Sequence, residues 1–443
     1  MKNDLTLRTR REFLRTTVLG GALSWTVPTF LANTFSVLQS EAADKATQVA
    51  TGHDSNILVV LQMAGGNDGL NTVVPRTNDY YHRARPRIGL SEKQVLTLND
   101  EVGLNSSLDG FKDLYDAGQL SVIQGVGYPN PNRSHFRSTE IWQTACDSER
   151  IEKYGWLGRY FDNTCNGCDP TVAVNIGRQM PQAFDARHPK GVSLDNPQNY
   201  RFISPEKARA GEMSSAEDSF RKLNQPEEEM TENSGGTIEA IHGPARQNGS
   251  VLDFLERTAL DAQVSSDTIR AIASRSDNKA TYPQSQLGNA LKLVGKLIGG
   301  GLPTRVFYVS QGGYDTHTNQ AGAHDRLLKD LGDSVKAFVQ DMKGQGNMSR
   351  VMLMTFSEFG RRVSENASSG TDHGAAAPMF VVGNKVNAGL LGKYPSLAPG
   401  DLFQGDLKYS VDFRSVYAGV LEKWLRTKSE PILGKKFAPL QVV

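Results

Sequence analysis

Residues 349–384 have the sequence SRVMLMTFSEFGRRVSENASSGTDHGAAAPMFVVGN, in which two short apolar runs flank a polar loop. The runs Val351–Phe356 and Met379–Val382 have the length and composition of buried β-strands. The loop between them is rich in Gly and Ser and carries ionisable side chains, among them Glu358, Arg361, Asp372 and His373. Such a loop is either a solvated connection or part of a metal site at the carboxyl end of a sheet. The rest of the sequence decides between the two.

Similar apolar runs recur along the chain and alternate with helical patterns. The predicted buried strands are Asn56–Met63, Leu120–Val126, Val172–Ile176, Arg305–Ser310, Val351–Phe356 and Met379–Val382. The predicted helices are Ser138–Cys146, Val251–Ser274, Gln284–Leu297, His324–Met342 and Asp412–Leu425. The apolar residues between His324 and Met342 form one stripe at helical spacing. Buried strands alternating with helices predict an α/β fold, with a mostly parallel sheet sandwiched by helices.

The overall composition excludes two classes of protein. The chain has 443 residues, with 49 Lys and Arg against 48 Asp and Glu, so no excess of positive charge suggests a nucleic-acid partner. Its body contains no apolar run of about 20 residues, so we expect no integral membrane domain.

The N-terminus has the pattern of a twin-arginine export signal. Arg10 and Arg11 are followed by Phe13, Leu14 and a weakly apolar stretch. We therefore expect residues 1–43 to be a signal and leader that the twin-arginine translocase reads, and the mature protein to be periplasmic or extracellular. An ordinary amphipathic helix with a chance arginine pair is the alternative. The folded domain is predicted to span 54–443, with residues 203–241 as a polar insertion or flexible segment.

The three cysteines limit the kinds of metal site that are possible. Cys165 and Cys168 form a C-x-x-C pair, but no second pair exists, which excludes a four-thiolate zinc site. In an exported protein this pair favours a disulfide, and Cys146 is then left over.

Polar side chains gather at the predicted strand ends. They are Asn67 and Asp68, Ser134 and His135, Asp315 and His317, Glu358, and finally Asp372 and His373. Ligands of open α/β sheets bind outside the carboxyl ends of the strands, so these residues predict one composite site. Carboxylate oxygens and imidazole nitrogens are ligands that suit zinc or manganese, and magnesium or calcium are further candidates.

Several motifs resemble a known bacterial family. They are QMAGGNDGLNTVVP, VGYPNPNRSHFRSTEIW, GWLGRY, GGYDTHTNQ, FSEFGRR, TDHGAAAPMFVVG and DFRSVYAGVLEKWL. Together they are similar to the uncharacterised family called domain of unknown function 1501, from about Asn56 to the C-terminus. That family in turn resembles the alkaline phosphatase and sulfatase superfamily, which implies an alkaline-phosphatase-like core.

The resemblance also implies roles for individual residues. Ser134 would be the nucleophile at a helix N-terminus. Beside it in the sequence, His135, Arg137 and Arg133 are candidates to bind the anionic substrate, with His135 and Arg137 as further catalytic residues, or they are simply solvated side chains. The implied metal ligands are Asp68, Asp315, His317, Glu358, Asp372 and His373, with His324 as an alternative to His317. Phe359 follows Glu358 where the superfamily has a histidine ligand, which leaves the second metal without that ligand.

Several of these residues also have a structural alternative. His317 and His373 can each serve only as a structural hydrogen-bonding partner. Ser134 can simply cap a helix, and Asp68 can shape a turn. Glu358 can form a buried ion pair with Arg361 or Arg362.

Two functions follow from the sequence. The favoured one is an exported metal-dependent hydrolase of phosphate or sulfate esters, acting on a small anionic ester or a polysaccharide. The alternative is a non-catalytic envelope protein of the same fold that binds polysaccharide or a protein partner.

Overall fold

The computed structural model describes residues 55–165, 168–188, 191–197, 265 and 267–443. The predicted leader 1–43, the polar segment 203–241 and most of the predicted helix 251–274 lie outside the described residues, although 267–275 is helical. No helix among the described residues is long and apolar enough to cross a membrane.

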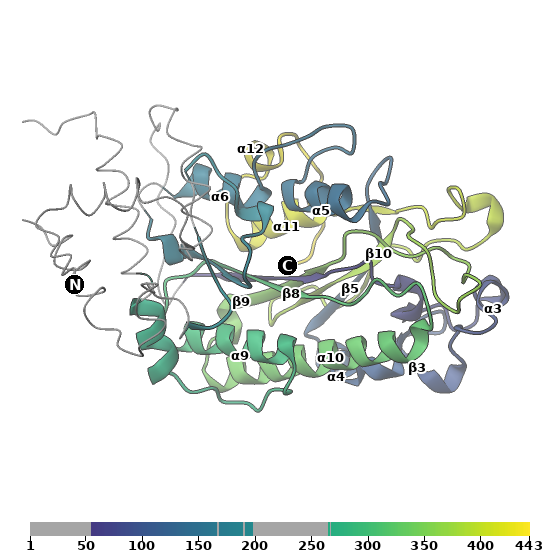
Figure 1. The fold of residues 1–443 in the computed structure, drawn as a ribbon, viewed down its shortest axis with the longest axis horizontal. Helices are drawn as coiled ribbons and strands as arrows, with labels where there is room; N and C mark the ends of the chain where they lie inside the picture. The colour runs from purple at the N-terminus through teal and green to yellow at the C-terminus, as the bar shows by residue number, and fades with distance from the viewer. Residues whose placement is uncertain (1–54, 166–167, 189–190, 198–264, 266) are drawn as a thin grey trace, which may run out of the picture.

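One mixed sheet runs through the middle of the molecule (Figure 1). Its strands are β1 (Ile57–Met63), β5 (Leu120–Gly127), β6 (Ala173–Ile176), β7 (Val192–Leu194), β8 (Val306–Gln311), β9 (Val351–Phe356), β10 (Ala377–Val382), β11 (Gly389–Leu391) and β12 (Val411–Asp412). Their order is β11-β5-β10-β9-β1-β8-β6-β7, with β12 paired to β5. Every pairing is parallel except those of β10, which runs antiparallel to both β5 and β9. The predicted α/β class and all six predicted strands are confirmed.

The strands are apolar throughout because both faces of the sheet are covered. In β1, Ile57, Val59 and Leu61 belong to the core on one face, while Leu58 and Val60 belong to the core on the other. Successive side chains of a strand point to opposite faces, so a strand buried on both sides shows no polar alternation. This explains why continuous apolar runs located the strands.

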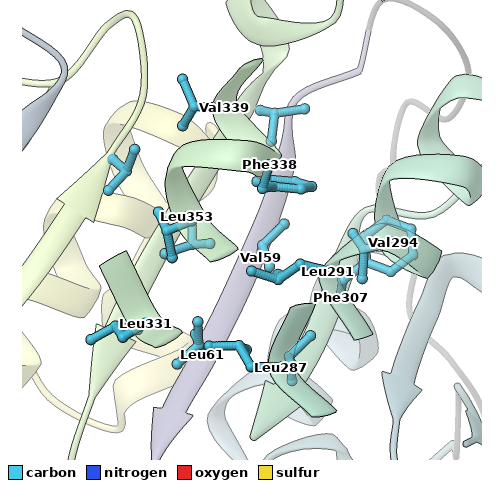
Figure 2. Packing of buried hydrophobic residues seen from close by; sticks show 14 of the residues in the cluster. Val59, Leu61, Leu287, Leu291, Val294, Phe307, Leu331, Phe338, Val339 and Leu353 are labelled. Carbon is cyan, nitrogen blue, oxygen red and sulfur yellow. The ribbon is translucent and has the colours of Figure 1, made fainter. Parts of the chain in front are cut away.

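One helical layer consists of α4 (Asp109–Asp116), α9 (Gln286–Gly299) and α10 (Gln320–Gly344), which lie together below the sheet in Figure 1. Figure 2 shows side chains of α9 and α10 packed against Val59, Leu61, Phe307 and Leu353 of the sheet. The helix α10 begins four residues before the predicted start and ends two residues after the predicted end.

The opposite layer consists of α5 (His135–Thr144), α6 (Trp156–Thr164), α11 (Phe413–Gly419) and α12 (Glu430–Leu433), and α11 continues into a π-helical segment, Val420–Trp424. Its centre is aromatic. The ring of Trp142 stacks on Phe413 at 4.3 Å between centroids and on Phe356 at 5.5 Å. These contacts fix α5 against the end of β9, which places the first turn of α5 at the edge of the sheet.

The remaining elements are short. A second, antiparallel sheet has the order β2 (Val73–Val74), β4 (Gly103–Asn105) and β3 (Val95–Thr97), and α3 (Asp79–Ala84) precedes β3 in the chain. Single 3-10 turns lie at Gly69–Asn71, Glu92–Gln94, Ser106–Leu108, Pro170–Val172, Gln182–Phe184, Met348–Arg350 and Pro399–Asp401.

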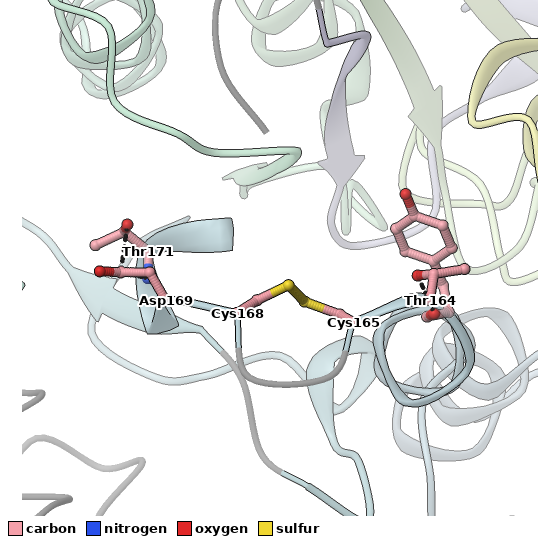
Figure 3. The surroundings of a disulfide bond; sticks show 6 residues. Thr164, Cys165, Cys168, Asp169 and Thr171 are labelled. Atoms are coloured by element: carbon pink, nitrogen blue, oxygen red, sulfur yellow. Dashed lines mark hydrogen bonds between the residues drawn. A yellow bond between two sulfur atoms is a disulfide. The ribbon is translucent and has the colours of Figure 1, made fainter. Parts of the chain in front are cut away.

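A disulfide joins Cys165, just after α6, to Cys168, with 5.6 Å between their Cα atoms (Figure 3). The free cysteine Cys146 is buried. The pairing expected for an exported chain is confirmed.

Candidate metal centre

The predicted site residues meet at one edge of the sheet because of how the strands run. The strands β1, β5, β8 and β9 are mutually parallel in direction and end at the same edge, while the antiparallel β10 begins there. The loop that carries Asp372 and His373 joins β9 to β10, so it stays at this edge throughout. Six of the predicted residues form one group, here called the histidine–carboxylate cluster: His135, Asp315, His317, Glu358, Asp372 and His373.

The centre of this cluster can hold a metal ion. His135, Asp315 and His373 each offer one donor atom, and these atoms lie within 4.8 Å of one another. His135 Nε2 is 3.4 Å from Asp315 Oδ2, and His373 Nε2 is 3.1 Å from Asp315 Oδ1. Donors that share one tetrahedral zinc at ~2.0–2.2 Å stand ~3.3–3.5 Å apart, and the distance between His135 Nε2 and Asp315 Oδ2 matches this value.

Both imidazoles are oriented through their other nitrogen. His135 Nδ1 is 2.9 Å from Glu358 Oε1, and His373 Nδ1 is 2.8 Å from the backbone oxygen of Arg133. Metal-binding histidines commonly use one nitrogen in this way, which fixes the ring and directs the other nitrogen at the metal. The ligand chemistry of the two rings therefore fits the predicted metal.

Glu358 is the buried member of the cluster, with 2% of its surface exposed. Its Oε1 also accepts a 2.8 Å hydrogen bond from the backbone N–H of Gly65. Among the described residues its Oε2 has no hydrogen-bond partner. A buried carboxylate oxygen without a partner is costly, and a bound cation beside it would remove that cost.

His317 and Asp372 form the outer rim. His317 Nε2 lies 3.0 Å from Asp315 Oδ1 and 2.9 Å from His373 Nε2. Its Nδ1 is 3.3 Å from Asp372 Oδ1. Both side chains are about half exposed, so this side of the cluster is open to solvent. A hydrogen bond from Asn366, the strongest influence on Asp372, lowers the pKa of that carboxyl, and His317 acts in the same direction.

Arg361 lies beneath the cluster with a fully buried side chain. Its Nη2 donates to Asp315 Oδ1 at 2.7 Å. Partial burial raises the pKa of Asp315, but hydrogen bonds from Arg361 and His373, together with the charges of Arg361 and His317, outweigh it and lower the pKa to about 2. Asp315 is therefore a carboxylate at any physiological pH. The predicted alternative that Glu358 pairs with Arg361 or Arg362 is wrong: Glu358 bonds to His135, Arg361 pairs with Asp315, and Arg362 lies 3.8 Å from Asp406.

Phe359 forms the apolar side of the histidine–carboxylate cluster. Its ring centroid is 4.9 Å from that of His135 and 4.5 Å from that of His373. The loop after β1 passes directly over this ring, and a Cβ on Gly66 would come within 2.2 Å of it. Gly66 also has a φ of +77°, so both space and backbone conformation require glycine there.

Asp68 lies at the same edge but is not part of the cluster. It forms a 2.6 Å ion pair with Arg85, and both side chains are fully buried. Its Oδ2 also accepts a 2.5 Å hydrogen bond from Gln320. Burial raises the pKa of Asp68, but the charge and hydrogen bond of Arg85 outweigh it, so the net shift is downward. Sequence reasoning missed Arg85, because nothing in its local pattern marks it.

The predicted catalytic residues differ in their surroundings. His135 belongs to the histidine–carboxylate cluster. Ser134 is the exposed N-cap of α5, and its hydroxyl makes no capping hydrogen bond with the helix. Arg137 instead donates to backbone oxygens of the following loop, including that of Ser148 at 2.9 Å, and pairs with Glu140. Arg133 pairs with the buried Asp406. The alternative ligand His324 is also buried, bonded to Asn67 at 2.9 Å, and burial lowers its pKa.

The family can be assigned directly. A family model described as "Protein of unknown function (DUF1501)" matches residues 55–434. The chain belongs to this family. No curated protein matches this DUF1501 chain.

Solved structures give distant similarities. The crystal structure of Ps i-CgsB in complex with k-i-k-neocarrahexaose is 12% identical with a TM-score of 0.32, and the match covers 86% of this DUF1501 chain and 73% of that chain. A protein in the alkaline phosphatase superfamily from Vibrio parahaemolyticus is 10% identical with a TM-score of 0.37, covering 92% and 77%. The C-terminal periplasmic domain of EcEptC from Escherichia coli, in complex with Zn, is 11% identical with a TM-score of 0.32, covering 78% of each. The neighbours are thus alkaline-phosphatase-like. At such low scores they decide nothing about chemistry, and the function proposed below rests on the side chains of the cluster.

Proposed function

We propose that this DUF1501 protein is an exported, metal-dependent hydrolase of phosphate or sulfate esters. The observation that carries the proposal is the convergence of donor atoms from His135, Asp315 and His373, and Ser134, the N-cap of α5, directly precedes His135 in the chain. A divalent cation bound there would polarise the ester oxygen and favour the ionised form of a nearby hydroxyl. His135, Asp315 and His373 are its proposed ligands, with the free oxygen of Glu358 as a candidate fourth.

Ser134 is the proposed nucleophile. A serine hydroxyl is a weak nucleophile at its own pKa and needs a neighbouring group to activate it. The exposed Ser134 hydroxyl is not used to cap α5, which removes the main support for a purely structural role. The first backbone N–H groups of α5 have no acceptor within the helix and favour an anion next to them. An ester anion placed at this helix terminus would meet both the hydroxyl and the cluster.

Arg133 is the better candidate to bind substrate oxygens than Arg137. The backbone oxygen of Arg133 contacts His373, and its side chain is about one-third exposed. The guanidinium of Arg137 is engaged by the loop that follows α5.

The test combines elemental analysis with a panel of phosphate and sulfate ester substrates. Ser134→Ala should lower turnover by roughly 10³-fold or more while leaving the metal content unchanged. His373→Ala should lower metal content and activity in parallel. Ser106→Ala and His82→Ala are matched controls outside the cluster, and both should behave as wild type. Thermal unfolding of each variant shows that it is folded.

One outcome rejects the proposal. If wild-type protein purified with abundant metal holds none, and Ser134→Ala leaves any ester hydrolysis untouched, the hydrolase function fails. The alternative of a non-catalytic binding protein would then stand. Phe136 on the first turn of α5 favours that alternative, because 90% of its surface is exposed and an aromatic ring can pack against a sugar or a protein partner.

A further inference from the structure

We infer that Arg361 is the second positive charge of this site, and that the cluster therefore binds one divalent cation per chain. The inference rests on the proposed function, since it concerns the cation that the hydrolase would use. It specifies how many cations the site takes and which protein group replaces a further one.

Arg361 is held in place by three separate loops. It donates from Nε to Gly66 O, from Nη1 to Thr371 O, and from Nη2 to Gly65 O, Tyr314 O and Asp315 Oδ1. These acceptors come from the loop after β1, the loop after β8 and the loop before β10. A guanidinium keeps its proton at any pH a protein survives, and with its donors committed it cannot turn away. Arg361 is thus a permanent, fixed cation at the base of the cluster.

The charges of the cluster balance with one divalent ion. Three carboxylates, Asp315, Glu358 and Asp372, face one guanidinium, which leaves two negative charges when the histidines are neutral ligands. One divalent cation cancels them. A second would bring two uncompensated positive charges close to Arg361, whose side chain is buried together with that of Glu358, so that water screens the repulsion at this end of the cluster only weakly.

The arrangement of the donor atoms also supports a single cation. Asp315 Oδ1 is already 2.7 Å from Arg361, whereas Oδ2 faces His135. Phe359, only 1% exposed, fills the space against both His135 and His373 and offers no donor. Among the described residues, His135, Asp315 and His373 offer donors close enough to share an ion. His317 Nε2 lies 3.0 Å from Asp315 Oδ1 and 2.9 Å from His373 Nε2, so it adds a donor to this same set and does not begin a separate one.

The first experiment measures stoichiometry. The full chain is dialysed to equilibrium against zinc or manganese and assayed by elemental analysis, with the same protein treated with a chelator as the blank. We expect about one ion per chain at saturation. Two ions per chain overturn the inference but leave a metal-dependent hydrolase possible. No bound ion overturns the inference, and the proposed function fails with it if Ser134→Ala also leaves ester hydrolysis untouched.

The second experiment isolates the charge of Arg361. Arg361→Lys keeps the charge and Arg361→Gln removes it, while both lose the five-donor fork. If the charge limits cation binding, the Gln variant should bind zinc at least about tenfold more tightly than the Lys variant, or take a second ion. Equal affinity and equal stoichiometry in the two variants overturn the inference. Should both variants fail to fold by thermal unfolding, the wild-type stoichiometry decides alone.

Discussion

Asp68 and Arg85 form a buried ion pair behind the histidine–carboxylate cluster. Arg85 also donates to the backbone oxygens of Val363 and Arg362, so it joins the loop after β1 to the loop after β9. A buried charge that loses its partner is strongly destabilising, because neither water nor another group replaces the lost interaction. The pair therefore holds the site together from behind without contacting a ligand.

Asp68→Asn should destabilise the protein and leave its metal content unchanged. Removing the carboxylate leaves Arg85 as an uncompensated buried charge, which costs roughly 3–5 kcal/mol of unfolding free energy. Urea unfolding and elemental analysis measure the two effects. Asp100→Asn, at an exposed position, is the matched control and should change neither. Loss of metal with little loss of stability would instead make Asp68 a ligand, as the family resemblance implies.

The same pair predicts how stability depends on pH. The pKa of Asp68 in the folded protein lies below its ordinary value of 3.8. The unfolded chain then binds a proton at Asp68 more readily, so the stabilisation is complete above about pH 4 and is lost as the pH falls through the folded-state pKa. The difference in unfolding free energy between wild type and Asp68→Asn should therefore shrink on acidification from about pH 5 to about pH 3. A difference that stayed constant over this range would contradict the assignment.

At the scale of elements, α10 carries much of one core. Leu331, with Leu328, Val335 and Phe338, faces the sheet and is fully buried. Figure 2 shows Leu331 and Phe338 among the side chains of β1, β8 and β9. The same helix begins with Gln320, which bonds to Asp68, so its packing also positions the back of the site.

Leu331→Ala should lower the unfolding free energy by about 2–5 kcal/mol, because it leaves a cavity between α10 and the sheet. Arg326→Ala, on the exposed side of the same helix, should change it little. Chemical denaturation of both variants gives the comparison. Similar losses in the two would show that the helix is not packed as described.

The segment after α6 allows a direct count of thiols. With Cys165 and Cys168 joined, protein made in an oxidising compartment and denatured without reductant should show one reactive thiol per chain, and three after reduction. Cys146→Ser should show none before reduction. Three thiols without reductant would mean that the disulfide does not form.

At the scale of the whole molecule, helical layers cover both faces of one sheet and form two separate cores with it (Figure 1). The residues of the histidine–carboxylate cluster lie together at a single edge of that sheet. Both faces of the sheet are used for packing, so the edge is where chemistry can reach solvent. This arrangement lets the loops after β1, β5, β8 and β9 each contribute to one site while the strands stay fully buried.

Export concerns the whole molecule as well. Replacing Arg10 and Arg11 together by Lys should trap the precursor in the cytoplasm if residues 1–43 are a twin-arginine signal. Cell fractionation of tagged full-length protein measures this, with Arg15→Lys as the control. Unchanged export of the double variant would refute the signal. Since a folded protein crosses by this route, the metal would be bound before export.

Much of this protein follows from its sequence alone. Continuous apolar runs located the six strands, because strands buried on both faces carry that pattern within a few residues. The polar residues at the strand ends identified His135, Asp315, His317, Glu358, Asp372 and His373 as one site, since strand ends in such folds meet at one edge. Family membership was also readable from local motifs. The C-x-x-C pair only favoured a disulfide, and the structure decided that Cys165 and Cys168 are joined.

Only the tertiary structure decided the direction of the strands and the partners of the charged side chains. The antiparallel direction of β10 keeps His373 beside Asp315, and no local pattern encodes strand direction. Asp68 is bound by Arg85 rather than by the cluster, Arg361 pairs with Asp315 rather than Glu358, and Arg137 turns away to the loop after α5. A charged side chain takes the partner that the packed backbone brings within a few ångströms. That choice depends on how folding brings the segments together, which residue spacing cannot reveal: Asp68 pairs with Arg85 across 17 positions, and His135 bonds to Glu358 across 223.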